Sequence, residues 1–211
     1  MRWRERKSKT GGQSGSGPRS LKVLAIPGSL RRQSFNRRLA YAAAAVAPSG
    51  LSVSIHEDLD SVPLFNEDLE AAGVPDGVAQ LVAAVAQADG VLLATPEYNQ
   101  SVPGVVKNMV DWLSRAEPAV LAAKPVGLMG ATIGQWGTRL AQAALRQTLT
   151  ACRALTMPAP QLYLRTSQEL FDRNGLLTDA RTAALLTDFM TSFKNWIEVM
   201  QPRHANGGEN S

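Results

Sequence analysis

The sequence predicts a three-layer α/β sandwich, in which helices cover both faces of one parallel sheet. Short β-like runs alternate with longer stretches of helical periodicity through the middle of the chain. The runs at 21–27, 90–95 and 125–131 are almost continuously apolar, which is typical of strands that are covered on both faces. Strict alternation and continuous apolar runs together predict one α/β domain over residues 21–200.

Five strands and five helices are expected, in strict alternation. The strands are expected at 21–27, 51–57, 90–95, 125–131 and, with a weaker pattern, 154–160. The helices are expected at about 35–47, 76–88, 103–115, 138–152 and 179–200. Residues 58–75 lack a clear period and are expected to form a long surface loop, although such insertions also border sites or subunit contacts.

Two of the helices should bury an apolar stripe. The stripe residues are Val105, Met109, Trp112 and Leu113 in the third helix, and Leu185, Phe189, Phe193, Trp196 and Met200 in the last. Both tryptophans are therefore expected in the core. Pro103 suits the first turn of the third helix, and Thr178 is the expected N-cap of the last.

Composition excludes several classes of protein. The chain has 211 residues and 45% hydrophobic content, enough for one substantial core. No apolar run reaches the roughly 18 residues of a membrane span, and no leader pattern opens the chain, so we expect a soluble, cytoplasmic protein without a membrane partner. Cys152 is the single cysteine and is expected to be a small core residue, and His56 is expected at the surface.

The basic character of the chain belongs to its first residues. Residues 1–20 hold six basic side chains and one acidic one, a charge of +5, whereas the whole chain carries +4, so the remainder is at −1. We therefore expect a disordered, basic, Gly/Ser-rich tail at 1–20, a second disordered tail at 201–211, and no nucleic-acid partner. A basic arm that touches nucleic acid is the alternative.

The most informative motif is GSLRRQSFN at 28–36, between the first strand and the first helix. The first turn of a helix leaves N–H groups without internal partners, so this junction attracts anions. Ser29 and Ser34 can donate hydroxyls, and Arg31 or Arg32 can offer a planar fork to phosphate oxygens. The motif predicts a phosphate site, with a polar helix-capping loop as the alternative. It lacks the spacing of nucleoside-triphosphate loops and of dinucleotide folds.

Two further loops are expected at the same edge of the sheet, where ligands collect in open α/β folds. Residues 95–104, TPEYNQSVPG, contain prolines that stiffen the path, the flat ring of Tyr98 and the amide of Asn99. Residues 130–138, GATIGQWGT, contain glycines that permit close approach of the backbone to a ring. Each loop also fits plain turn chemistry. Their coincidence with the phosphate motif predicts a site for a planar heteroaromatic group.

The three loops resemble those of the flavodoxin-like NAD(P)H-dependent FMN reductases, which include bacterial quinone, chromate and azobenzene reductases. GSLRRQSFN is similar to that family's phosphate loop G-S-x-R-x-x-S-x-N, PEYNQSVPGVVKNMVDWLSR to its flavin loop and following helix, and GATIGQWGTRLAQAALRQTL to its third loop. The resemblance covers about residues 21–200 and implies a five-stranded parallel sheet in the order 2-1-3-4-5. The sequence departs from many relatives at 135–138, where Trp136 either shapes the acceptor pocket or simply packs.

The resemblance implies a binding site for FMN that is built from all three loops. The residues implied for the FMN phosphate are Ser29, Leu30, Arg31, Ser34, Phe35 and Asn36. Those implied for the isoalloxazine ring are Pro96, Glu97, Tyr98 and Asn99, largely through main chain, with Thr132 and Gly134 on the other side. No carboxylate pair, metal-ligand cluster or nucleophile–base set stands out, so we expect no catalytic side chain and no metal.

The resemblance further implies an oxidoreductase that passes hydride from NADPH or NADH through FMN to a quinone or similar small electrophile. A flavodoxin-type FMN electron carrier without nicotinamide turnover is the alternative, as is a flavin-responsive binding protein that uses the basic arm. Electron carriers usually present an acidic docking face, and the nearly neutral core disfavours that class. A homodimer or homotetramer is expected, since the family tends to form them.

Overall fold

The computed structural model describes residues 19–165, 170–172 and 176–201. The predicted tails at 1–20 and 201–211 therefore lie outside the described residues, except for Arg19, Ser20 and Gln201. In the part of the chain that is described, no helix has both the length and the apolar character to cross a membrane. No group of His, Cys, Asp or Glu side chains with the makings of a metal site is found there either.

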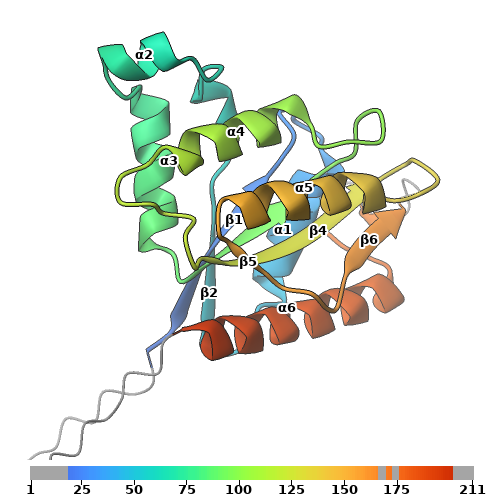
Figure 1. Ribbon diagram of the computed structural model, residues 1–211. Helices are drawn as coiled ribbons and strands as arrows, with labels where there is room; N and C mark the ends of the chain where they lie inside the picture. The colour runs from blue at the N-terminus through green and yellow to red at the C-terminus, as the bar shows by residue number, and fades with distance from the viewer. Residues whose placement is uncertain (1–18, 166–169, 173–175, 202–211) are drawn as a thin grey trace, which may run out of the picture.

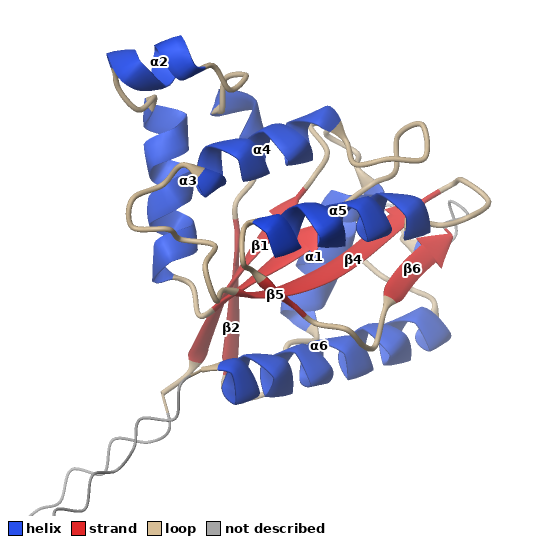
Figure 2. Cartoon of the chain, viewed as in Figure 1, coloured by secondary structure: helices blue, strands red, loops and turns tan. Residues whose placement is uncertain are grey.

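A parallel sheet forms the middle of three layers (Figures 1 and 2). Its strands are β1 (Leu21–Pro27), β2 (Leu51–Ile55), β3 (Gly90–Ala94), β4 (Pro125–Thr132), β5 (Leu155–Thr156) and β6 (Leu162–Arg165). Their order is β2-β1-β3-β4-β5, with β6 also paired to β4. All the pairings are parallel, so the predicted sandwich and the order 2-1-3-4-5 are confirmed.

The predicted fifth strand at 154–160 is wrong in its extent. Only β5 pairs there, against the beginning of β4, and the chain then leaves the sheet and returns as β6 against the end of β4. Pro158 and Pro160 lie in the interruption, and proline has no N–H to donate to a ladder. The outer edge of the sheet is thus shared by two short strands.

The described part of the chain contains six α-helices. They are α1 (Phe35–Ala45), α2 (Glu67–Ala72), α3 (Asp76–Gln87), α4 (Gly104–Ser114), α5 (Arg139–Ala151) and α6 (Ala180–Met200). Of these, α2 and a 3-10 turn at Leu59–Ser61 fall in the segment predicted as a loop. Pro103 is the N-cap of α4, one residue before the helix begins. The N-cap of α6 is Asp179 rather than Thr178, because the Asp179 carboxylate accepts a hydrogen bond from Thr182 N–H at 2.7 Å.

Two apolar cores lie on either side of the sheet. One packs α3, α4 and α5 against it, and the other packs α1 and α6 against the opposite face, as Figure 1 shows. Trp112 of α4 is only 2% exposed and its Nε1 donates to Pro63 O at 2.8 Å, which ties the 58–75 segment to the first core. The Asn108 side chain adds hydrogen bonds to the same segment, at Pro63 O and Phe65 N–H.

Several side chains differ from expectation in their burial. The stripe of α6 runs through Leu186, Phe189 and Phe193, whereas Leu185 is 49% exposed and Trp196 is half-buried with Nε1 donating to Leu155 O. Cys152 is half-buried and packs against the first core as expected, and its burial raises the pKa of its thiol. His56 is half-buried rather than a surface residue.

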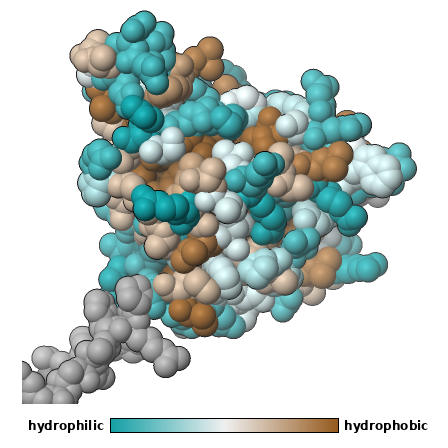
Figure 3. Space-filling view, in the orientation of Figure 1, coloured by the Kyte–Doolittle hydropathy of each residue, from teal (hydrophilic) through white to brown (hydrophobic). Residues whose placement is uncertain are grey.

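Exposed apolar side chains gather near α2. Leu64 is 81% exposed, Leu69 37% and Val74 58%. The space-filling view shows apolar patches around α2 at the upper left, among mostly hydrophilic neighbours (Figure 3). A cavity of about 430 Å³ lies nearby, and Val78, Val82 and Trp112 are among the residues that line it.

Candidate functional site

A cavity of about 410 Å³ opens at the edge of the sheet where β1, β3 and β4 end. Its volume lies within the usual range for small-molecule sites. The residues that line it are Ser29, Arg31, Ser34, Phe35, Asn36, Pro96, Glu97, Tyr98, Thr132 and Ile133. The three loops singled out in the sequence therefore converge on one hollow.

All but three of the predicted site residues line this cavity. Leu30, Asn99 and Gly134 are not among its lining residues, and the Leu30 side chain is 56% exposed to solvent. Ile133 also lines the cavity and was not predicted from the sequence. Its only signal was an aliphatic side chain in a loop whose one other large apolar residue is Trp136.

The first loop ends in a capped helix. Ser34 is the N-cap of α1, and its Oγ accepts hydrogen bonds from the N–H groups of Asn36 at 3.2 Å and Arg37 at 3.4 Å. The N–H of Phe35 belongs to the same first turn and has no acceptor inside the helix. This end of the cavity thus combines a backbone donor, two hydroxyls and the positive end of a helix.

Arg31 holds its guanidinium beside that helix start. The guanidinium carbon lies 5.5 Å from the centre of the Phe35 ring, and Nη2 donates to Gln33 O at 3.2 Å. These contacts orient the planar group while leaving donors for a ligand. Arg31 and the first turn of α1 therefore bring together the kinds of donor that an anion requires.

The Asn36 side chain makes hydrogen bonds within the protein. It is buried, with Nδ2 donating to Ala131 O at 2.9 Å and Oδ1 accepting from Ala131 N–H at 2.8 Å. Both ends of the amide are thus engaged with the backbone of β4. The residue lines the cavity, but its clearest role is to join the first loop to the end of β4.

The second loop contains a tight turn. Tyr98 and Ser101 exchange backbone hydrogen bonds at 3.2 and 3.0 Å, and both central residues have positive φ, 49° at Asn99 and 61° at Gln100. Two successive residues in the left-handed backbone conformation define a type I′ turn. Asn99 is not among the residues that line the cavity, whereas Tyr98 lines it and has its hydroxyl 3.4 Å from Ser29 Oγ.

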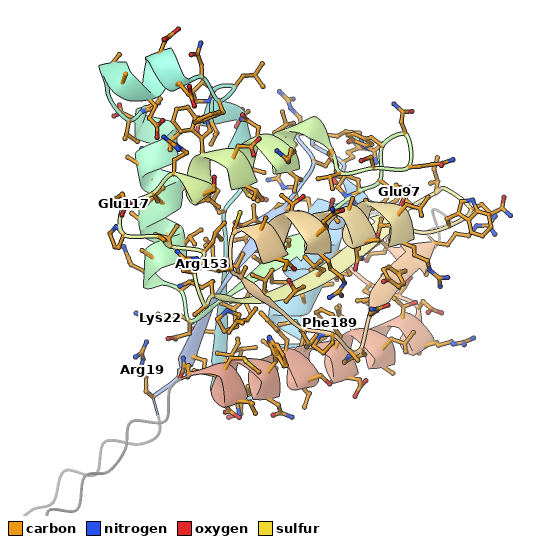
Figure 4. All side chains as sticks on the ribbon, viewed as in Figure 1. Arg19, Lys22, Glu97, Glu117, Arg153 and Phe189 are labelled. Atoms are coloured by element: carbon orange, nitrogen blue, oxygen red, sulfur yellow. The ribbon has the colours of Figure 1, made fainter. Side chains whose placement is uncertain are left out.

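Glu97 connects the second loop to the third. Its Oε2 accepts hydrogen bonds from the N–H groups of Leu140 at 2.9 Å and Ala141 at 3.0 Å, in the first turn of α5. Figure 4 shows Glu97 close to the end of α5 where that helix begins. The carboxylate is therefore turned toward a helix start, and the Glu97 side chain is held at the cavity wall.

Gly130, the first residue of the third loop, lies within β4. It is required for packing and not for the approach of a ligand. A Cβ at Gly130 would collide with Thr138 Oγ1 and Thr95 O. Gly28 is similarly required by the Val106 side chain, which a Cβ would meet. Trp136 is 62% exposed, so it does not pack in the interior.

The cavity as a whole fits a flat molecule with a phosphate group. Arginine, hydroxyl and N–H donors lie at the end formed by α1, and Pro96, Tyr98 and Ile133 add apolar surface on the walls formed by the other two loops. The one carboxylate among the lining residues, Glu97, is engaged with α5. These are the requirements of a flavin mononucleotide.

Comparison with known proteins agrees with this geometry. A family model described as NADPH-dependent FMN reductase matches residues 21–169. An NAD(P)H-dependent FMN reductase of Pseudomonas aeruginosa is 37% identical over 86% of this chain and 97% of its own length. A 2-hydroxy-1,4-benzoquinone reductase of a Burkholderia species is 36% identical over 84% of this chain and 97% of its own.

The fold comparison points the same way. The solved structure of FerB, a flavoenzyme NAD(P)H:(acceptor) oxidoreductase from Paracoccus denitrificans, superposes with a TM-score of 0.78. It is 33% identical in sequence, and the match covers 85% of this chain and 98% of that one. The family model covers well over half of the chain, and the relatives match 84–86% of it. The chain therefore belongs to the NADPH-dependent FMN reductase family.

Proposed function

We propose that this protein oxidises NADPH or NADH and reduces a quinone or a similar small electrophile, with FMN as its bound cofactor. Membership in the family makes it an FMN-dependent oxidoreductase with a nicotinamide donor. The relatives named as quinone reductases support a small-molecule acceptor. The observation that carries the proposal is the single cavity shared by three loops, with its anion site at one end.

The first loop is the proposed site of the FMN phosphate. Ser29, Arg31 and Ser34 have side-chain donors at the cavity, and the Phe35 N–H adds a backbone donor. A hydrogen bond to a charged group stabilises by about 1.5–3 kcal/mol, more than the roughly 0.3–1 kcal/mol of an exposed helix dipole. The side chains are therefore expected to dominate the affinity for the phosphate, with α1 as a supplement.

The second and third loops are the proposed walls for the ring. Pro96 and Tyr98 lie on one wall, and Thr132 and Ile133 on the other. When bound, FMN supplies the redox chemistry, in which NAD(P)H, a proton and a quinone become NAD(P)⁺ and a hydroquinone. The protein's own residues hold the reactants at contact distance and exclude water, and no side chain is required as a general acid.

We also propose a division of the chain into one folded unit at 21–200 and two tails, and a homodimer or homotetramer as the assembly. The exposed apolar residues near α2, together with the cavity beside α3, support an interface between subunits. Sedimentation velocity of the purified protein tests the assembly, and a monomer at micromolar concentration would contradict it.

An absorbance experiment tests the main proposal. The purified protein, incubated with FMN and separated from the excess, should retain a flavin absorbance band, and anaerobic NADPH should bleach that band. Protein that stays colourless after FMN has been added would refute the proposal. Steady NADPH oxidation with a quinone present would distinguish a reductase from an electron carrier without nicotinamide turnover.

A further inference from the structure

Residues 133–136, in the middle of the loop between β4 and α5, have few contacts that hold them in place. In the described part of the chain the hydrogen bonds of these four residues are local, from Gly134 N–H to Thr132 Oγ1 and from Gly137 N–H to Gly134 O, both at 3.3 Å. Ile133 is 71% exposed and Trp136 62% exposed, so packing contributes little. The position of this wall of the cavity is therefore determined by its two ends.

Each end of the loop is held by a side chain from one of the other two loops. At the β4 end, the Asn36 amide makes two hydrogen bonds with the backbone of Ala131. At the α5 end, the Glu97 carboxylate accepts from the N–H groups of Leu140 and Ala141. The partners are distant in sequence, 95 residues apart for Asn36 and 43–44 for Glu97.

The side chain at the N-cap position of α5 does not cap the helix. Thr138 is its N-cap residue but makes no side-chain capping bond, and Thr138 Oγ1 instead accepts from Gln142 Nε2 at 2.9 Å. The Glu97 carboxylate takes the place of that cap, and its negative charge complements the positive end of the helix. The start of α5 thus depends on a residue of the second loop.

We propose that Glu97 is a positioning residue, whose carboxylate sets the separation between the wall at Pro96–Tyr98 and the wall at Thr132–Ile133. This inference rests on the proposed FMN site, because the two walls are the ones that would enclose the ring. The carboxylate acts through the first turn of α5 rather than by touching the ring. Its removal should loosen the third loop before any ligand is present.

Three substitutions separate the role of the hydrogen bonds from that of the charge. Glu97→Gln keeps an oxygen that can accept from both N–H groups, while Glu97→Ala removes the acceptor. Glu97→Asp shortens the side chain by one methylene and serves as the test variant should the alanine variant fail to fold. Glu117→Ala is the matched control, because Glu117 is exposed and lies far from Glu97 in Figure 4.

The first measurement is amide hydrogen exchange of Leu140 and Ala141 in the protein without FMN. Glu97→Ala, or Glu97→Asp in its place, should raise exchange at these two amides at least tenfold, since they lose their acceptor. The second measurement is FMN affinity by flavin fluorescence titration. The same variant should raise the Kd about tenfold or more, whereas Glu97→Gln should stay within about threefold of wild type.

The outcomes distinguish the proposal from a merely structural role. Unchanged exchange at Leu140 and Ala141 would overturn it, and so would raised exchange with an unchanged Kd for FMN. A Glu97→Gln variant as impaired as Glu97→Ala, or an equal effect of Glu117→Ala, would also overturn it. Wild-type protein that binds no FMN at all would instead refute the proposed function, and the exchange result would still stand on its own.

Discussion

Arg31 places a permanent positive charge at the end of the cavity formed by α1. Its guanidinium is held over the Phe35 ring and by the Gln33 carbonyl. A planar guanidinium that is already oriented loses little entropy when it binds phosphate. The anion site is therefore expected to depend on this side chain more than on the helix dipole.

Replacing Arg31 with alanine should weaken FMN binding about ten- to a hundredfold, as expected for the loss of one charge-assisted contact. Fluorescence titration with FMN measures the change. Arg32→Ala is the control. Arg32 is adjacent in sequence and carries the same charge, but it is exposed and does not line the cavity. Equal losses in the two variants would mean that general positive charge, rather than Arg31 itself, attracts the ligand.

Asn36 contributes to the stability of the site as well as to its shape. Substitution with alanine leaves the N–H and C=O of Ala131 without their partners in a buried position. Each unsatisfied group costs about 1–3 kcal/mol, so Asn36→Ala should lower the free energy of unfolding by about 2–6 kcal/mol. Urea denaturation followed by circular dichroism measures it, and a loss below 1 kcal/mol would contradict the role as a buried tie.

The turn after β3 is a local element under strain. Asn99 tolerates its left-handed conformation, but Gln100 at φ 61° has a Cβ that this region disfavours by about 1–2 kcal/mol. Asn-Gly is the preferred pair in such a turn. Gln100 occupies the position at which such turns prefer glycine. A glycine there should therefore increase the stability of the protein.

Gln100→Gly should therefore stabilise the protein by about 0.5–1 kcal/mol, the strain relieved less the entropy that glycine loses on folding. Thermal unfolding by differential scanning calorimetry detects the change. Gln147→Gly, the same substitution at an exposed position inside α5, should instead destabilise by about 1 kcal/mol. A destabilising effect of Gln100→Gly would show that the turn at Asn99 and Gln100 is not strained.

The apolar pattern of the sequence predicted the strands and helices well wherever that pattern matches the burial of the residues in the fold. The continuously apolar runs of β1, β3 and β4 were found because both of their faces are buried. The fifth strand was misplaced because β5 and β6 are each too short to show a period, with two prolines between them. Leu185 was assigned to the buried stripe because residues one position apart differ little in helical pattern, yet Leu186 is the buried one.

The candidate site was predictable in its loops but not in its connections. Residue type and loop position identified Ser29, Arg31 and Tyr98, which line the cavity. The hydrogen bonds of Asn36 to Ala131 and of Glu97 to α5 join residues 43 to 95 positions apart. Such pairings depend on how the loops meet in space, which a single sequence does not encode in any local pattern.

The Asp89 carboxylate makes hydrogen bonds with residues at both ends of the domain. It lies at the end of the strands opposite the cavity. Asp89 accepts from Arg19 Nη2 and Lys22 N–H at 2.8 Å and from Gln201 Nε2 at 3.2 Å. Arg19 and Gln201 lie just outside the predicted domain of 21–200. This cluster supports the proposed boundaries, because the chain enters and leaves the folded unit at the same point.

The response of the folded protein to acid should depend on His56, which follows β2. Burial lowers the pKa of His56, and the nearby Asp58 offsets this only in part. Its Nε2 is buried without a hydrogen-bond partner among the described residues, so protonation there is disfavoured. The unfolded chain, with a histidine pKa of about 6.5, therefore binds the proton more readily than the folded one.

Stability from this group is consequently complete above about pH 6.5 and is lost as the pH falls from there through the lower pKa of the folded state. Asp179 also has a lowered pKa, owing to its hydrogen bonds with Thr182, but its contribution is lost only in a more acidic range. Unfolding free energies from urea titrations at pH 7.5 and pH 5.5 separate the two groups. Wild type should lose more stability between these values than His56→Gln, and an equal loss in both proteins would show that His56 is solvated.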